Sequence, residues 1–390
     1  MKKHILLCAA LALSSFGLPS CSDILDQKPL DSYTDTAVWG DLSLAESFLN
    51  YCYLRVEAEN TNGVMFCNYT DETYHMHDYG TSTYTQGRAS CDNYNTGWTE
   101  GKGNTWSHYY GGIKLCNQLL EDIMDTPANT DSEKEWKNQI IGQGYFLRAY
   151  YYHMLYSVYG RIPLIDHTYD LDSEFKEERA DMDDVADFIV ADCDKAAELL
   201  PTVYKDASDF GRATKGAALA LKGRVLLYKA SPLFGTPSRE KWQAAADANK
   251  AVIDMNIYSL KQVSNSDEYA DLFFDSKNPE VIFEKLYDEK GIAGSSASLV
   301  MQAPAGPGNG YEGWSTWQPT YEIVELFQNA DGTPYKPAET KPFTILQTTI
   351  DPDSGEATQK EVTIQASDVN PWEGREIRLK ANILYDGMLW

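Results

Sequence analysis

Two stretches of this 390-residue chain combine aromatic rings with polar side chains, and they lie far apart in the sequence. The first covers residues 69–106 and the second covers residues 311–317. The side chains that could contact a ligand there are Asp71, Arg88, Trp98, Asn104, Tyr311, Trp314 and Trp317. A sugar ring has an apolar face of C–H bonds edged by hydroxyls, which suits a Trp or Tyr ring flanked by hydrogen-bonding groups. We therefore predict that the two stretches converge into one shallow, solvent-open sugar site at one end of a helical frame.

A competing interpretation places some of these rings in the hydrophobic core. Trp106 falls on the apolar face of an expected helix and is interpreted as a core residue. Trp98, Trp314 and Trp317 lie in or beside glycine-containing sequence, where packing and ligand contact fit the pattern equally well. The tyrosines of residues 145–152 lie in a helical motif, and we interpret them as packing residues.

Other patterns that carry chemistry are missing or weak. The sequence contains no GxSxG nucleophile elbow, no HExxH zinc motif and no phosphate-binding P-loop. Asp351 and Asp353 precede a glycine that comes one position too early for a calcium loop, so this segment is interpreted as a turn. His75 and His77 alternate in a loop without a partner at metal-site spacing, and we expect a solvated surface there. We therefore predict a protein that is not an enzyme and that holds no metal ion or cofactor.

The elements that must position the candidate residues are mostly helices. Apolar residues recur at three- and four-residue spacing over several blocks, which predicts amphipathic helices. The expected helices are residues 41–59, 105–125, 132–159, 182–200, 213–230, 239–255 and 321–328. Residues 280–287 alternate in polarity and predict a strand, whereas residues 343–350 and 361–364 flank a turn and predict a β-hairpin.

We expect these helices to pack as stacked hairpins. Small residues at 216–220 and 244–248 stand where two helices would approach closely. The predicted fold is mainly α, with a tetratricopeptide-like frame of helical hairpins, a loop-rich face and a few short strands or hairpins. The frame covers about residues 41–59 and 105–255, and the loop-rich face covers about residues 60–104 and 280–390.

The N-terminus has the pattern of an export signal. Lys2 and Lys3 precede an apolar run that is too short to span a bilayer, which takes about 20 residues. The run ends in a lipobox-like stretch before Cys21, so we predict that residues 1–20 are a signal peptide and that Cys21 is lipidated. An ordinary signal peptide that is cleaved near Ser20 is the alternative. A lipid on Cys21 would anchor the protein to a membrane without spanning it.

Charge and cysteine usage narrow the possible partners and chemistry. The chain has 58 Asp and Glu residues against 33 Lys and Arg residues, which gives a formal net charge of −25. A protein that neutralises phosphates needs a basic face, so this composition argues against a nucleic-acid partner. Cys52, Cys116 and Cys193 fall at apolar positions of expected helices, and we predict that they are buried free thiols.

Several motifs resemble the SusD/RagB family of surface lipoproteins from the Bacteroidetes. They lie at residues 21–26 (CSDILD), 144–152 (GYFLRAYYY), 159–164 (YGRIPL), 211–228 (GRATKGAALALKGRVLLY), 278–283 (NPEVIF) and 370–379 (NPWEGREIRL). The resemblance covers nearly the whole chain, which is expected to consist of a signal peptide, residues 1–20, and one SusD-like domain, residues 21–390. Residues 376–378 read Glu-Ile-Arg where the family usually has Asp-Pro-Arg, and the chain ends soon afterwards. We therefore expect that a C-terminal part of the domain is missing.

The resemblance implies a non-catalytic protein of the cell surface. Such a protein binds a glycan and delivers it to a SusC-like TonB-dependent transporter of the outer membrane. Some relatives bind peptides instead, so a helical-repeat scaffold that binds peptide or protein at the outer membrane is the alternative. A secreted glycosidase of unrecognised type is a third hypothesis. The implied location is the outer membrane, with a lipid anchor and with the protein facing the cell exterior.

Overall fold

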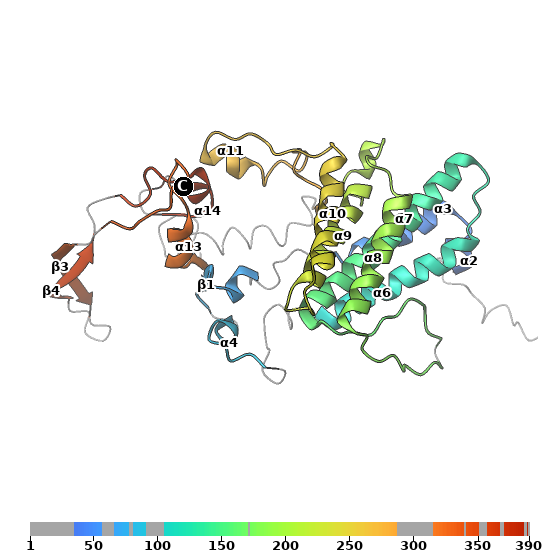
Figure 1. Ribbon diagram of the computed structural model, residues 1–390, viewed down its shortest axis with the longest axis horizontal. Coiled ribbons are helices and arrows are strands. Elements are labelled where there is room, and N and C mark those ends of the chain that lie inside the picture. Colours follow the sequence, from blue (N-terminus) through green and yellow to red (C-terminus); the bar gives the residue numbers. More distant parts are fainter. Residues whose placement is uncertain are drawn as a thin grey trace, which may run out of the picture.

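The computed structural model describes residues 35–56, 66–77, 81–90, 105–170, 172–286, 315–338, 341–350, 357–366, 370–385 and 388. Within these residues the protein is mainly helical, which confirms the predicted fold class. The helical frame consists of α2 (Asp35–Val38), α3 (Leu42–Tyr53), α6 (Thr105–Asp122), α7 (Asp131–Tyr159), α8 (Met182–Leu199), α9 (Lys215–Ala230) and α10 (Arg239–Asp254). From α6 to α10, each helix packs against the next one in the chain, and α3 packs against α6 and α7 (Figure 1). This is the tetratricopeptide-like arrangement of stacked hairpins.

The boundaries of α7 follow from residues that cap its two ends. The amide of Glu133 donates to the Thr130 hydroxyl at 3.2 Å, and the amide of Thr130 donates to the Glu133 carboxylate at 2.8 Å. This reciprocal pair satisfies amide groups that the start of a helix leaves open. The helix is followed by Gly160, whose φ of +65° is a conformation that favours glycine.

Close packing between α6 and α7 depends on a small residue. A Cβ atom at Gly112 of α6 would stand 2.7 Å from Cδ2 of Tyr151 in α7. The Tyr151 side chain is fully buried, and its hydroxyl donates to the carbonyl of Cys52 in α3 at 2.6 Å. Tyr152 is fully buried as well. The prediction that the tyrosines of this motif serve packing is therefore confirmed for these two residues.

A charged pair lies inside the frame and joins three helices. Arg148 of α7 donates from Nε to Oδ2 of Asp192 in α8 at 2.7 Å, and from Nη2 to Oδ1 at 2.9 Å. The two side chains are only 6% and 2% exposed. Arg148 also donates from Nη1 to Oδ1 of Asn117 in α6 at 2.9 Å. Burial lowers the pKa of Arg148, but the hydrogen bond to Asp192 and its charge outweigh this effect, and the pKa lies above its ordinary value.

Shorter elements form the remainder of the described chain. They are η2 (Phe66–Tyr69), β1 (Thr73–His75), α4 (Thr81–Thr85), η3 (Ile123–Asp125), η4 (Ala207–Asp209), α11 (Ser266–Asp271), β2 (Trp317–Pro319), α13 (Tyr321–Leu326), β3 (Lys341–Ile350), β4 (Ala357–Ala366) and α14 (Ile377–Asn382). In Figure 1, β3 and β4 lie at the end of the molecule that is farthest from the frame, and β1, α4, α13 and α14 lie between them and the frame. β1 pairs antiparallel with β2, β3 pairs antiparallel with β4, and α11 packs against α14.

Most of the predicted elements are confirmed in these short segments and in the frame. The predicted β-hairpin is present as β3 and β4, which pair from Lys341 with Ala366 to Ile350 with Ala357. The predicted helix over residues 321–328 is present as α13. The helices of residues 105–255 lie within a few residues of their predicted bounds.

Two predicted elements differ from the structure. Residues 280–286 do not form a strand: they carry no strand partner in the described part of the chain, and the Phe283 ring packs 5.0 Å from the Phe146 ring of α7. The alternation of residue types is not matched by alternating burial, because residues 281–285 are all half-buried, so the pattern alone was misleading. The helix predicted over residues 41–59 ends at Tyr53, and a turn follows at residues 54–55.

Candidate functional site

A short strand pair joins the two stretches that the sequence analysis singled out. β1 and β2 pair antiparallel, and His75 stands opposite Trp317 in the register. Beyond the strand ends, the amide of Thr320 donates to the carbonyl of Glu72 at 2.9 Å, and the Thr320 hydroxyl donates to the carbonyl of Asp71. The pairing therefore fixes the segment around residue 72 beside the segment around residue 318.

The strand pair joins the segments of two predicted ligand-binding residues, but the residues themselves are not opposite each other, since Trp317 pairs with His75 and Asp71 lies two residues before β1. Asp71 is exposed at the start of this region, and Trp317 is half-buried in β2. Arg88 is exposed and follows α4, whose Tyr84 ring lies 5.1 Å from the Tyr69 ring of η2. The residues that lie outside the described part of the chain are Trp98, Asn104, Tyr311, Trp314 and the predicted lipidation residue Cys21. A ligand-binding role for the seven residues stays a prediction.

The two histidines of this region differ in their surroundings. His77 is exposed, as the sequence predicts for a solvated loop, but His75 is only 1% exposed because β1 turns it inward opposite Trp317. The sequence analysis did not predict that His75 is buried in a strand or that Thr320 bonds to the segment of Asp71. A three-residue strand is too short for its alternation to be recognised, and its partner lies in the other half of the chain. Among the described residues, no cluster of three or more His, Cys, Asp or Glu side chains could hold a metal ion.

Several groups with strongly shifted pKa values lie in the frame rather than at the strand pair. Cys52, Cys116 and Cys193 are buried free thiols, as predicted. Burial raises the pKa of Cys116 and Cys193 above the ordinary value. A thiol reacts as its thiolate, so Cys116 and Cys193 are poor nucleophiles at neutral pH. Their role is packing.

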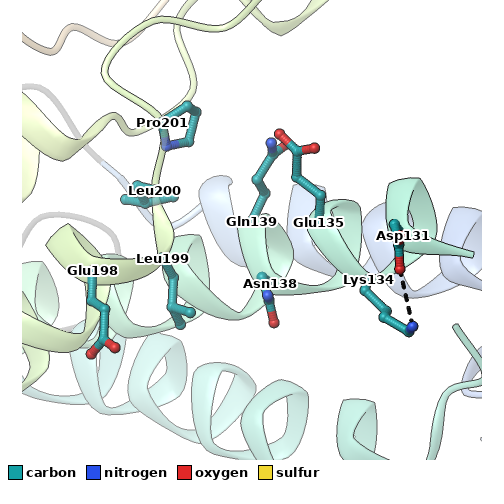
Figure 2. A pocket seen from close by; sticks show the side chains of 9 residues that line it. All are labelled: Asp131, Lys134, Glu135, Asn138, Gln139, Glu198, Leu199, Leu200 and Pro201. Atoms are coloured by element: carbon teal, nitrogen blue, oxygen red, sulfur yellow. Dashed lines mark hydrogen bonds and ion pairs between the residues drawn. The ribbon is translucent and has the colours of Figure 1, made fainter.

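A groove between the start of α7 and the end of α8 has a volume of about 380 Å³. Figure 2 shows its polar side chains spread along the groove, with Glu198 at one end and Asp131 at the other. Asp131 forms an ion pair with Lys134 at 3.2 Å, and both side chains are exposed. No aromatic ring is among the nine residues that line this groove. It therefore offers hydrated charges but no platform for a sugar ring, and the strand-pair region is the better candidate.

Two family models match this sequence over most of its length. One, described as "Starch-binding associating with outer membrane", matches residues 23–227, and the other, described as "SusD family", matches residues 279–390. The chain belongs to the SusD family. This confirms the resemblance that the motifs indicated.

This chain is also similar to individual SusD-like proteins, at low sequence identity. SusD-like protein P38 from Formosa agariphila is 23% identical over 342 residues, which cover 82% of this chain and 61% of the relative. The crystal structure of a SusD-like protein from Bacteroides fragilis matches with a TM-score of 0.69 and 24% identity, over 91% of this chain and 62% of that one. A SusD-like carbohydrate binding protein, also from Bacteroides fragilis, matches with a TM-score of 0.67 and 22% identity, over 90% of this chain and 61% of that one. The chain thus spans about three fifths of the length of these relatives.

The family description also concerns the cellular location of its members. The description of the first model connects its members with the outer membrane. Within the described residues, none of the helices combines the length and the apolar character that crossing a membrane would take. The lipid on Cys21 and the partner transporter stay predictions.

Proposed function

We propose that this SusD-family chain is a non-catalytic binding protein of the outer membrane that captures oligosaccharide and delivers it to a TonB-dependent transporter. The observation that carries the proposal is family membership over both halves of the chain. A relative of similar fold is described as a carbohydrate binding protein, which supports a saccharide as the ligand. The strand pair adds support, because it holds Asp71 close to the segment of Trp317.

The proposed contacts follow from the chemistry of sugar rings. Trp317, with Trp98 or Trp314, would stack on the apolar face of a sugar, while Asp71, Arg88 and Asn104 would bind hydroxyls. An exposed ring contributes about 1 kcal/mol beyond the area that it buries. A few such contacts give weak binding, with a Kd between roughly micromolar and millimolar, or about −8 to −4 kcal/mol. Weak capture suits a protein that must release its ligand to a transporter.

A glycan panel and a peptide panel test the proposal on the purified protein without residues 1–20. Saturable binding to one or more glycans, with unchanged oligosaccharide products by chromatography, is the expected result. Binding to peptides alone would favour the scaffold hypothesis, and shortening of the glycan would identify a glycosidase. Either of these outcomes contradicts the proposed function.

The membrane arrangement is tested separately in the native organism. Because the proposed anchor is the lipid on Cys21, Cys21→Ala is expected to move the protein from the membrane fraction to the soluble fraction. Affinity purification of the unaltered protein under mild detergent is expected to recover a TonB-dependent transporter. Persistent membrane association of the variant contradicts the anchor, and repeated recovery of the protein alone contradicts the partnership.

A further inference from the structure

The connection between α7 and α8 is longer than a helical hairpin needs. It runs over residues 160–181, all of them described except residue 171, whereas helix–helix connections in bundles usually take about 2–8 residues. Long ordered connections of this kind usually carry function. This one folds back over α6 instead of passing directly to α8, as its contacts show.

Side chains of the frame hold the connection in place. The Tyr152 hydroxyl donates to the carbonyl of Ile165 at 2.8 Å and accepts from the amide of Ile165 at 2.7 Å. The Asn117 amide group donates to the carbonyls of Ile165 and His167, both at 3.0 Å. The first half of the connection is therefore fixed from two neighbouring helices.

Charged side chains also help to hold the connection in place. The buried pair of Arg148 and Asp192 orients the Asn117 side chain, because Arg148 donates to Oδ1 of Asn117 at 2.9 Å. The amide and the hydroxyl of Thr168 donate to the Glu121 carboxylate of α6 at 2.9 and 2.6 Å. The backbone at residues 165–168 is thus ordered before any ligand arrives, so binding there would not have to order it.

A cavity of about 400 Å³ lies between this connection and α6, and we name it the α6 pocket. Trp106 and Tyr110 of α6 line it with rings 4.9 Å apart, and Tyr169 and Phe175 of the connection line it with rings 6.0 Å apart. The Phe175 side chain is 59% exposed, and Tyr169 is 36% exposed. These two rings are therefore not needed to fill the core. The volume lies within the range of small-ligand sites, about 300–1,000 Å³.

Charged groups of both signs lie at or beside the α6 pocket. Lys114 lines the pocket and forms no ion pair within the described part of the chain, so it disfavours a cation between the rings. Three carboxylates lie beside the pocket without lining it: Glu121 accepts from Thr168, Asp166 lies 3.2 Å from His167, and Glu177 accepts from Tyr169. Their negative charge offsets the charge of Lys114, so an anion gains little there. A neutral ligand with an apolar face and polar edges fits these surroundings.

We propose that the α6 pocket is a second saccharide subsite, separate from the strand-pair region, and that it takes one neutral sugar ring of a glycan. The aromatic rings would contact the C–H faces, and Lys114 and His167 at the rim would bind hydroxyls. This inference rests on the proposed function, since it assumes that the ligand is a glycan.

Phe175→Ala tests the subsite, and Phe274→Ala is its matched control because Phe274 is 86% exposed and does not line the pocket. Both variants and Trp314→Ala/Trp317→Ala are applied to an array of neutral hexose oligosaccharides, uronic-acid glycans and sulfated glycans. The Kd for the neutral oligosaccharide that the unaltered protein binds most tightly is then measured by calorimetry. Loss of one stacked ring is expected to raise the Kd of the subsite about fivefold. Phe274→Ala is expected to leave it unchanged, and both variants are expected to keep the thermal midpoint of the unaltered protein.

Each outcome decides between the two sites. Weaker binding by Phe175→Ala than by Phe274→Ala, on neutral glycans only, supports the subsite. Equal binding by these two variants, together with loss in the double tryptophan variant, overturns the α6 pocket and leaves the proposed function standing. A preference of the unaltered protein for acidic glycans also overturns the pocket. If the unaltered protein binds no glycan at all, both the proposed function and the subsite are overturned.

Discussion

Adding one methyl group at Gly112 tests the packing of α6 on α7. The new Cβ would lie 2.7 Å from Cδ2 and 2.8 Å from Cε2 of Tyr151. The Tyr151 ring has little room to move, because it is fully buried, lies 6.0 Å from the Tyr109 ring and is tied to Cys52 through its hydroxyl. Gly111, the preceding residue of the same helix, offers a matched control, since a Cβ there would meet only the end of Arg55 at 3.5 Å.

The magnitude follows from two opposing effects. Replacing glycine by alanine inside a helix stabilises it by about 0.5–1 kcal/mol, and this gain applies to both positions. Overpacking a core by one methyl group costs about 1–3 kcal/mol, and this penalty applies only to Gly112. Gly111→Ala is therefore expected to raise the free energy of unfolding slightly. Gly112→Ala is expected to be about 1–3 kcal/mol less stable than Gly111→Ala, because the helix-propensity effect cancels in the difference.

Urea denaturation followed by far-ultraviolet circular dichroism measures this difference. Both variants are expected to keep the slope of the unfolding transition, and Gly112→Ala is expected to unfold at a lower urea concentration. Equal midpoints for the two variants would show that Tyr151 does not pack against Gly112 as described. A Gly112→Ala protein more stable than Gly111→Ala would refute the α6–α7 packing outright.

Three further perturbations probe other parts of the account. Asp192→Asn leaves the Arg148 charge buried without its partner and is expected to lower the free energy of unfolding by about 3–5 kcal/mol. Its control is Asp254→Asn, in an exposed pair with Lys250, which should change the free energy of unfolding by less than about 1 kcal/mol. Similar losses for the two variants in urea denaturation would contradict the stabilising role of the buried pair. Burial lowers the pKa of His153 from its ordinary value of 6.5 to about 4. As the pH falls, the unfolded chain therefore binds this proton at a higher pH than the folded chain does. The free energy of unfolding is expected to fall by about 3 kcal/mol between pH 6.5 and pH 4. His153→Phe should reduce this loss in thermal scans across that range, and an unchanged pH profile would contradict it. Lys114→Ala is expected to leave the thermal midpoint unchanged, because its ammonium group makes no ion pair within the described residues, and a clear drop would argue against an open rim.

The sequence predicted the frame well because its signals are local. The α7 helix is bounded by a capping pair at Thr130 and Glu133 and by a glycine at 160, all visible as residue types. Non-local contacts were harder to predict. The segment of Phe283 was predicted to be a strand from its alternating residue types, but residues 281–285 are all half-buried and Phe283 packs on Phe146 of the frame.

The candidate sites depend on contacts of the same non-local kind. Trp317 and Asp71 were chosen by residue type, and the strand pair joins their segments through a contact across most of the chain. The α6 pocket was not predicted, because Tyr169 and Phe175 lie in a polar connection with no periodic pattern. Only the folded path of that connection places their rings in the pocket that Trp106 also lines. Residue types thus identified candidate rings, but not the partners that the fold gives them.

The most direct test of the proposed function is a calorimetric titration of the purified protein with the glycan that the panel identifies. The unaltered protein is expected to bind with a Kd between roughly micromolar and millimolar, without breaking the glycan. Trp314→Ala/Trp317→Ala is expected to lose most of this binding while its thermal midpoint stays nearly the same. Unchanged binding in the double variant would contradict the assignment of these rings to the site, and the absence of saturable binding by the unaltered protein to any glycan would contradict the proposed function itself.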